Sequence, residues 1–149
     1  MCAENGRAVS QNDPGCRKGR ALELMLAGQN VLVVEDAVLI LMNIEAMLGD
    51  FGCRSVASAG TVAEALALLA AAEFDLAIID VNLGPEESWP VAERLAALGV
   101  PFVFSTGHGD GVCDPRFVDR PVLRKPWVAR SLAATLATLL ADRALRDRA

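Results

Sequence analysis

Val31-Leu-Val-Val-Glu-Asp36 is a short apolar run that ends in two carboxylates. Four consecutive apolar residues without alternation are typical of a parallel strand that is buried on both faces of a sheet. The segment Leu76-Ala-Ile-Ile-Asp80 repeats this pattern and again ends in an acidic residue. The two segments together predict a buried sheet that presents carboxylates at the ends of its strands.

Strand and helix patterns alternate along the chain on either side of these segments. The predicted strands are residues 31–34, 54–57, 76–79, 102–104 and 122–123. The predicted helices are residues 36–48, 61–72, 88–98 and from about 127 to the end. Thr61 and Glu64 form a capping box at the start of the second helix, and Ser88 is expected to cap the third. The alternation predicts an α/β fold with a doubly wound, parallel, five-stranded sheet.

Two segments fit this pattern less well. Residues 107–118 stand where a helix should follow the fourth strand, but they contain three glycines and Pro115. We therefore expect this fourth helix to be weak or irregular. Residues 38–42 are apolar all round one helical turn, which is more than one core face needs. We expect ordinary burial there rather than a dimer surface.

The 149 residues suffice for one domain, and their 53% apolar content predicts a well-filled core. Residues 1–20 are rich in glycine, asparagine, aspartate and charge. We therefore predict a flexible N-terminal tail over residues 1–28 and a single domain over residues 29–149. A short helical turn over residues 21–27 stays open as an alternative.

The formal net charge of −5 disfavours direct binding of nucleic acid, which needs a basic face. An acidic protein suits a metal cation or a basic partner surface instead. The four cysteines lack metal-ligand spacing, which indicates free thiols in a reducing compartment. No apolar run approaches the length that spans a membrane. We therefore expect a cytoplasmic protein that binds neither nucleic acid nor membrane.

The predicted strand ends bring reactive side chains to one edge of the sheet. In open α/β sheets, ligands bind outside the carboxyl ends of the strands. Those ends carry Glu35 with Asp36, then Asp80, Thr106 and Lys125. Three neighbouring carboxylates repel one another unless a cation lies among them, and oxygen ligands beside a phosphate favour Mg²⁺.

Asp80, on the central strand, is the predicted nucleophile. A carboxylate can attack phosphorus and form an aspartyl phosphate. Lys125 offers a point charge, and Thr106 a hydrogen-bond donor, to the phosphoryl oxygens. Phosphoryl transfer needs mainly positioning and charge neutralisation, so this set predicts a phosphoacceptor site. For Asp80 taken alone, a role as a helix cap or turn former would be the simpler interpretation.

Four motifs resemble those of the receiver domains of bacterial response regulators. They are Val31-Leu-Val-Val-Glu-Asp36, Asp80-Val-Asn-Leu83, Phe104-Ser-Thr106 and Lys125-Pro126. The resemblance covers residues 31–140 and implies a flavodoxin-like sheet with strand order 2-1-3-4-5. It also implies that Glu35, Asp36 and Asp80 bind Mg²⁺, with the backbone carbonyl of Asn82 as a further ligand.

The resemblance further implies a phosphoryl donor, which is the phosphohistidine of a sensor histidine kinase or a phosphotransfer protein. Asp80 would accept the group, and Thr106 and Lys125 would contact it. Asn82 and His108 stand at positions that in receivers flank the hydrolytic water and tune the lifetime of the phosphate. For His108, an exposed loop histidine without a role is the alternative.

The segment Phe102-Val-Phe-Ser-Thr-Gly-His108 is similar to the Phe-Ala-Thr-Gly-Tyr-like signature of a receiver subgroup common in alphaproteobacteria. Members of that subgroup are often stand-alone and linked to general stress signalling. One position departs from the wider family, because Val122 replaces the Tyr or Phe that usually precedes the strand-five lysine by three residues. The usual aromatic switch is therefore missing. Our hypothesis is that the glycine-rich segment after Thr106 orders around the phosphoryl group instead.

These features predict a single-domain response regulator in two-component signal transduction. It would be a phosphoacceptor that catalyses its own phosphorylation and dephosphorylation, not an enzyme that acts on other molecules. Its output would be contact with an unknown downstream protein, by family habit through the fourth-helix region, the fifth strand and the last helix. A phosphorylation-independent scaffold and a receiver fragment of a larger regulator or hybrid kinase stay open as alternatives, as does a homodimer. A flavodoxin-type binding protein is disfavoured, because Glu35 and Asp36 stand where it needs a phosphate loop.

Overall fold

The structure is a computed structural model, and it describes residues 26–107, 114–117, 119–125 and 127–148. Its centre is a parallel sheet in the order β2-β1-β3-β6-β7, which confirms the predicted order 2-1-3-4-5. The strands are β1 (Asn30–Val34), β2 (Ser55–Ala59), β3 (Leu76–Asp80), β6 (Phe102–Thr106) and β7 (Val122–Arg124). The chain therefore has the doubly wound, flavodoxin-like fold.

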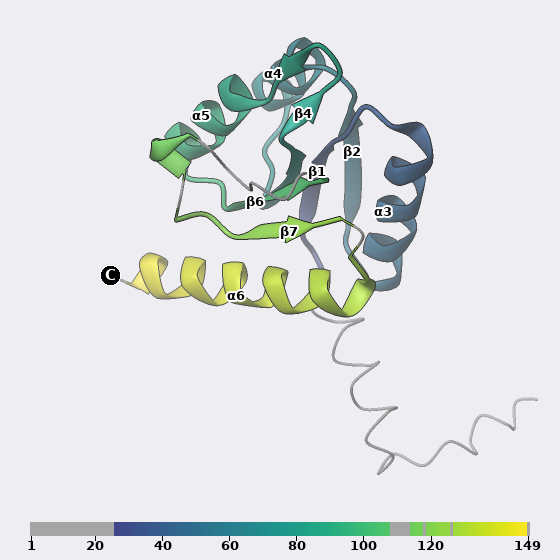
Figure 1. Ribbon diagram of the computed structural model, residues 1–149. Coiled ribbons are helices and arrows are strands. Elements are labelled where there is room, and N and C mark those ends of the chain that lie inside the picture. The colour runs from purple at the N-terminus through teal and green to yellow at the C-terminus, as the bar shows by residue number, and fades with distance from the viewer. Residues whose placement is uncertain (1–25, 108–113, 118, 126, 149) are drawn as a thin grey trace, which may run out of the picture.

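Helices cover both faces of the sheet, as Figure 1 shows. One layer contains α3 (Val38–Asp50) and α6 (Ala129–Arg148), and the other contains α4 (Val62–Ala71) and α5 (Trp89–Leu98). Between β6 and β7 the structure describes one short 3-10 helix, Pro115–Phe117, at the place of the predicted weak fourth helix. The remainder of that prediction falls on residues 108–113 and 118, which lie outside the described residues.

Side chains of the strands alternate between the two helical layers. Leu32 and Val34 pack in the core beneath α4 and α5, whereas Val31 and Val33 pack in the core beneath α3 and α6. All four side chains are buried. Burial on both faces removes the need for polar residues at alternate positions, which explains the continuous apolar run in the sequence.

The two predicted caps differ in outcome. Thr61 caps α4 as expected, because its Oγ1 accepts a hydrogen bond from the Glu64 amide at 3.1 Å. Ser88 occupies the N-cap position of α5, but its side chain makes no capping hydrogen bond. Pro90 stands in the first turn of that helix and has no amide hydrogen to donate, which removes one of the donors that a cap normally serves.

Most of the first turn of α3 is exposed, so the expectation of ordinary burial for residues 38–42 is wrong for three of them, whereas Ile40 and Leu41 are half-buried and pack against the core. Val38, Leu39 and Met42 are 66%, 81% and 58% exposed. The helix turns Ile44 and Leu48 fully into the core instead. Its apolar first turn therefore lies on the surface, immediately after Asp36.

The domain extends slightly further toward the N-terminus than its predicted start at residue 29. Leu26 is fully buried, and its amide donates to the Phe51 carbonyl at 3.3 Å. Leu26 therefore packs on the domain, although the sequence predicts it as part of the tail. Residues 1–25 of that tail lie outside the described residues.

Among the described helices, each is too short or too polar to traverse a bilayer. Cys53 is a free thiol, as predicted. The other three cysteines lie outside the described part of the chain.

Candidate functional site

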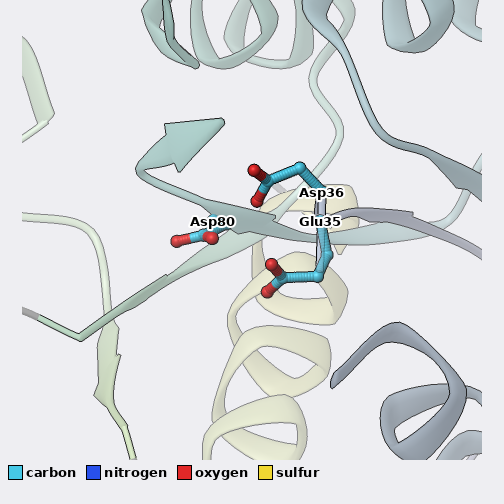
Figure 2. A group of neighbouring side chains, drawn as sticks. All are labelled: Glu35, Asp36 and Asp80. Carbon is cyan, nitrogen blue, oxygen red and sulfur yellow. The ribbon is translucent and has the colours of Figure 1, made fainter. Parts of the chain in front are cut away.

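Three carboxylates meet at the carboxyl edge of the sheet, as the sequence predicts. Glu35, Asp36 and Asp80 each offer an oxygen atom, and these atoms lie within 4.8 Å of one another. In Figure 2 the Asp36 side chain lies above and the Glu35 side chain below the segment after β1, and Asp80 at the end of β3 lies beside them. The strand register explains why two of them meet. Val34 of β1 pairs with Ile79 of β3, and the residues that follow this pair are Glu35 and Asp80.

The three carboxylates differ in burial. Glu35 and Asp80 are only 3% and 7% exposed, whereas Asp36 is exposed. Glu35 Oε2 accepts a hydrogen bond from the Ala37 amide at 3.1 Å, which holds this side chain in place. A cation at this point would meet two buried carboxylates and one that faces solvent.

Lys125 reaches the same cluster from the end of β7. Its amide donates to the Thr106 carbonyl at 2.8 Å, which fixes the backbone just beyond the strand. Its Nζ donates to Glu35 Oε1 at 3.0 Å and to Asp80 Oδ2 at 3.3 Å. The ammonium group therefore bridges the two buried carboxylates and neutralises part of their charge.

Burial and these contacts shift the pKa values of Asp80 and Lys125. Burial, and after it the negative charge of Glu35, raises the pKa of Asp80 from 3.8 to about 6, although Lys125 opposes the rise. Burial by itself would lower the pKa of Lys125, but the hydrogen bond to Glu35 and the charges of Asp80 and Glu35 outweigh it and raise that pKa. Lys125 is therefore positively charged at neutral pH. Ionisation of Asp80 is less favourable than that of an ordinary aspartate, and a further cation beside it would offset this cost.

Thr106 ends β6 at the same edge and is buried. The register pairs Asp80 with Ser105, so Thr106 lies one residue further along the neighbouring strand. Ser105 Oγ accepts a hydrogen bond from Trp127 Nε1 at 3.1 Å. This bond ties the end of β6 to the segment after Lys125. The sequence gives only an indirect signal of it, because a partly buried indole needs an acceptor for its N–H.

The remaining predicted site residues have different outcomes. Asn82 is half-buried and begins a two-residue strand, β4 (Asn82–Leu83), which pairs with β5 (Glu86–Glu87). The segment after Asp80 is therefore a hairpin. Val122 lies in β7 opposite Phe104, so an aliphatic side chain occupies the usual position of the switch aromatic. His108 lies outside the described residues.

The donor set fits a hard divalent cation. All three acidic residues of the cluster supply oxygen, which is the ligand that Mg²⁺ prefers. The ammonium group of Lys125 contacts Glu35 and Asp80, so three carboxylates share one positive charge and the cluster keeps room for a further cation. The residues present therefore match an acidic Mg²⁺ pocket.

The sequence profile of the response regulator receiver domain matches residues 31–120. The matched span includes the three carboxylates and Thr106. The chain belongs to the response regulator receiver family. This membership makes it a two-component signalling domain, as its motifs predict. No curated protein matches the chain.

Solved structures of other receivers are similar to this one. The solution structure of SdrG from Sphingomonas melonis Fr1 is 48% identical with a TM-score of 0.68, and the match covers 78% of this receiver and 98% of SdrG. The BeF3-activated conformation of SdrG from Pseudomonas melonis Fr1 is 49% identical with a TM-score of 0.66, over 76% and 98% of the two chains. TrrA from Thermotoga maritima, in complex with Mg²⁺-BeF, is 19% identical with a TM-score of 0.67 over 74% and 98%, which shows the fold alone.

Proposed function

We propose that this receiver accepts a phosphoryl group on Asp80 from a histidine kinase or a phosphotransfer protein, and that it signals through contact with a downstream protein. The observation that carries the proposal is the bridge from Lys125 Nζ to Glu35 and Asp80, at 3.0 and 3.3 Å, beside the exposed carboxylate of Asp36. It places a fixed positive charge against a buried nucleophile. Phosphoryl transfer needs this arrangement more than it needs covalent chemistry from the protein.

Mg²⁺ is the proposed cofactor, held by Glu35, Asp36 and Asp80 together with the backbone carbonyl of Asn82. When bound, it would neutralise the carboxylates and withdraw charge from the transferring phosphoryl group. Glu35 keeps its orientation through the Ala37 amide. Asp36 faces solvent, so the cation can enter from that side.

The reaction at Asp80 is a substitution at phosphorus. A carboxylate oxygen of Asp80 forms a bond to phosphorus, the bond from phosphorus to the donor histidine nitrogen breaks, and the imidazole leaves with that electron pair. Lys125 supplies a positive charge to one phosphoryl oxygen, and the Thr106 hydroxyl donates a hydrogen bond to another. Hydrolysis reverses the modification by attack of water on phosphorus, and we propose that Asn82 and His108 tune its rate. The receiver therefore catalyses its own phosphorylation and dephosphorylation.

The donor protein must bring its phosphohistidine to this edge of the sheet. The first turn of α3 begins two residues after Asp36 and exposes Val38, Leu39 and Met42. Exposed apolar side chains beside a site indicate a protein contact. We therefore assign this turn to the phosphodonor protein. Since such donors transfer phosphate inside the cell, the proposal also places this receiver in the cytoplasm.

Intact mass spectrometry tests the proposal directly. The chain is incubated with acetyl phosphate, with and without Mg²⁺, and compared with Asp80→Asn. We expect a single phosphoryl adduct on the wild type that requires Mg²⁺ and is absent from the variant. No adduct under any metal condition would overturn the proposal and favour a phosphorylation-independent scaffold.

A further inference from the structure

The hairpin that follows Asp80 lies against the acidic cluster. Its strands pair Asn82 with Glu87 and Leu83 with Glu86, and the Ser88 amide closes its base by donating to the Val81 carbonyl at 3.0 Å. Gly84 at the tip has a positive φ of 68°, a conformation that favours glycine.

The tip of this hairpin lies close to Asp36. A Cβ atom built on Gly84 would be 3.5 Å from Asp36 Oδ2, which is ordinary van der Waals contact. The hairpin therefore starts at one carboxylate of the cluster, Asp80, and reaches another. Its position decides where Asn82 stands relative to both.

Glu86 fastens the hairpin to a different part of the chain. Its Oε2 accepts a hydrogen bond from the Val62 amide at 3.0 Å, although 24 positions separate the two residues. Val62 is the first residue of α4, whose N-terminal amides lack partners within the helix. The positive end of the helix dipole also favours a carboxylate at this point.

Two further amides near this helix end donate to local side chains. The Glu64 amide donates to Thr61 Oγ1 at 3.1 Å, and the Gly60 amide donates to Glu64 Oε1 at 2.8 Å. Glu86 serves the Val62 amide instead, and it comes from a distant segment of the chain. What it adds is a link between α4 and the hairpin.

We propose that Glu86 is a positioning residue for the Mg²⁺ site, which it serves by holding the hairpin against Asp36. This inference rests on the proposed function, because it assumes that the carboxylate cluster binds Mg²⁺. Glu86 is not one of the proposed ligands of the cation, and its side chain binds the Val62 amide instead. It limits the movement of the segment that carries Asn82.

The test compares three variants of the full chain. Glu86→Ala removes the link to Val62, while Glu87→Ala removes the same charge from the adjacent residue of the hairpin. Glu87 accepts a hydrogen bond from Trp89 Nε1 at 3.2 Å and does not contact α4 through it. Glu86→Gln retains an oxygen that can accept from the Val62 amide. Circular dichroism melting confirms that each variant is folded.

The first readout is hydrogen exchange of the Val62 and Ser88 amides in the metal-free protein. We expect faster exchange in Glu86→Ala than in Glu87→Ala, with Glu86→Gln close to the wild type. Equal exchange in the two alanine variants would overturn the link, whether or not the protein binds Mg²⁺.

The second readout is the Mg²⁺ dissociation constant from calorimetry. We expect it to rise about tenfold in Glu86→Ala, at the low end of the losses caused by removal of groups that orient metal ligands. In Glu87→Ala and Glu86→Gln it should stay within about threefold of the wild type. Equal weakening in both alanine variants would show a charge effect and overturn the positioning role. If the wild type itself binds no Mg²⁺, the proposed function fails and this inference fails with it. If the wild type binds Mg²⁺ but the variants do not differ from one another as expected, only this inference fails.

Discussion

Lys125 Nζ lies 3.0 Å from Glu35 Oε1, although 90 positions separate the two residues in the chain. The same ammonium group lies 3.3 Å from Asp80 Oδ2. Lys125 therefore occupies the position of a counter-ion for two buried carboxylates that a metal would also bind. Lys125 and Mg²⁺ would therefore compete for the same two carboxylates, yet both would assist phosphoryl transfer.

Substitution Lys125→Gln separates these two roles. Removal of the ammonium group leaves Glu35 and Asp80 more negative, so Mg²⁺ should bind at least about fivefold more tightly. Phosphorylation by acetyl phosphate should become about a hundredfold slower, because a charge on the phosphoryl oxygens is lost. Calorimetry and intact mass measure the two effects.

Arg124→Gln is the matched control for this prediction. Arg124 is the neighbouring residue, carries the same charge and is exposed. Its loss should change both quantities by less than about twofold, because solvent screens an exposed charge. Equal effects of the two substitutions would contradict a specific role for Lys125.

The raised pKa of Asp80 predicts an unusual pH dependence of stability. In the folded, metal-free chain this pKa is about 6, against an ordinary value of 3.8. Between these values the folded state holds more protons than the unfolded state, so the free energy of unfolding falls as pH rises. Asp80→Asn should remove that part of the dependence.

Urea denaturation in EDTA measures this effect. At about pH 7.5 we expect Asp80→Asn to be more stable than the wild type by about 1 kcal/mol, after allowance for solvent that reaches the site. At about pH 3 and below the two proteins should have nearly the same stability, since Asp80 is then largely protonated in both states. Equal stability at both pH values would contradict the burial and charge assigned to Asp80.

The apolar turn of α3 predicts a difference between protein and small-molecule donors. Leu39→Ser should slow phosphotransfer from autophosphorylated histidine kinases of the source organism by about tenfold, because a well-placed apolar contact contributes about 1 to 2 kcal/mol. Phosphorylation by acetyl phosphate should be unchanged. Leu98→Ser, an identical change at an exposed leucine at the end of α5, is the control. Equal loss with both donors, or no loss with either, would refute the assignment.

The hydrogen bond from Trp127 to Ser105 predicts a spectroscopic effect. Ser105→Ala should destabilise the chain by about 1 kcal/mol and shift the fluorescence emission of Trp127, because the indole N–H loses its acceptor. Trp89→Phe provides a background with a single tryptophan. An unchanged emission maximum would show that this bond does not form in solution.

The fold could be predicted from the sequence because buried parallel strands leave a direct pattern. Val31 to Val34 and Leu76 to Ile79 are apolar without interruption, and both form strands of the central sheet. The ends of these strands also placed Glu35 and Asp80 together, since parallel strands share one carboxyl edge. Prediction of the site therefore followed from prediction of the sheet.

The parts that the sequence did not predict depend on contacts between distant segments. Glu86 in the hairpin accepts a hydrogen bond from the Val62 amide, 24 positions away, and nothing local in Gly84-Pro85 distinguishes the hairpin from a loop. The exposure of Leu39 depends on how α3 lies on the sheet, which its apolar composition does not encode. The sequence likewise gives no indication that Lys125 lies closer to Glu35 than to Asp80.

Identification of the phosphorylated residue tests the central claim most directly. The chain is phosphorylated with acetyl phosphate and Mg²⁺, reduced with sodium borohydride, which converts an aspartyl phosphate to homoserine, and digested for tandem mass spectrometry. The account predicts conversion at Asp80 and at no other acidic residue. Conversion at Asp36, or a phosphoryl adduct that leaves Asp80 unchanged, would contradict it.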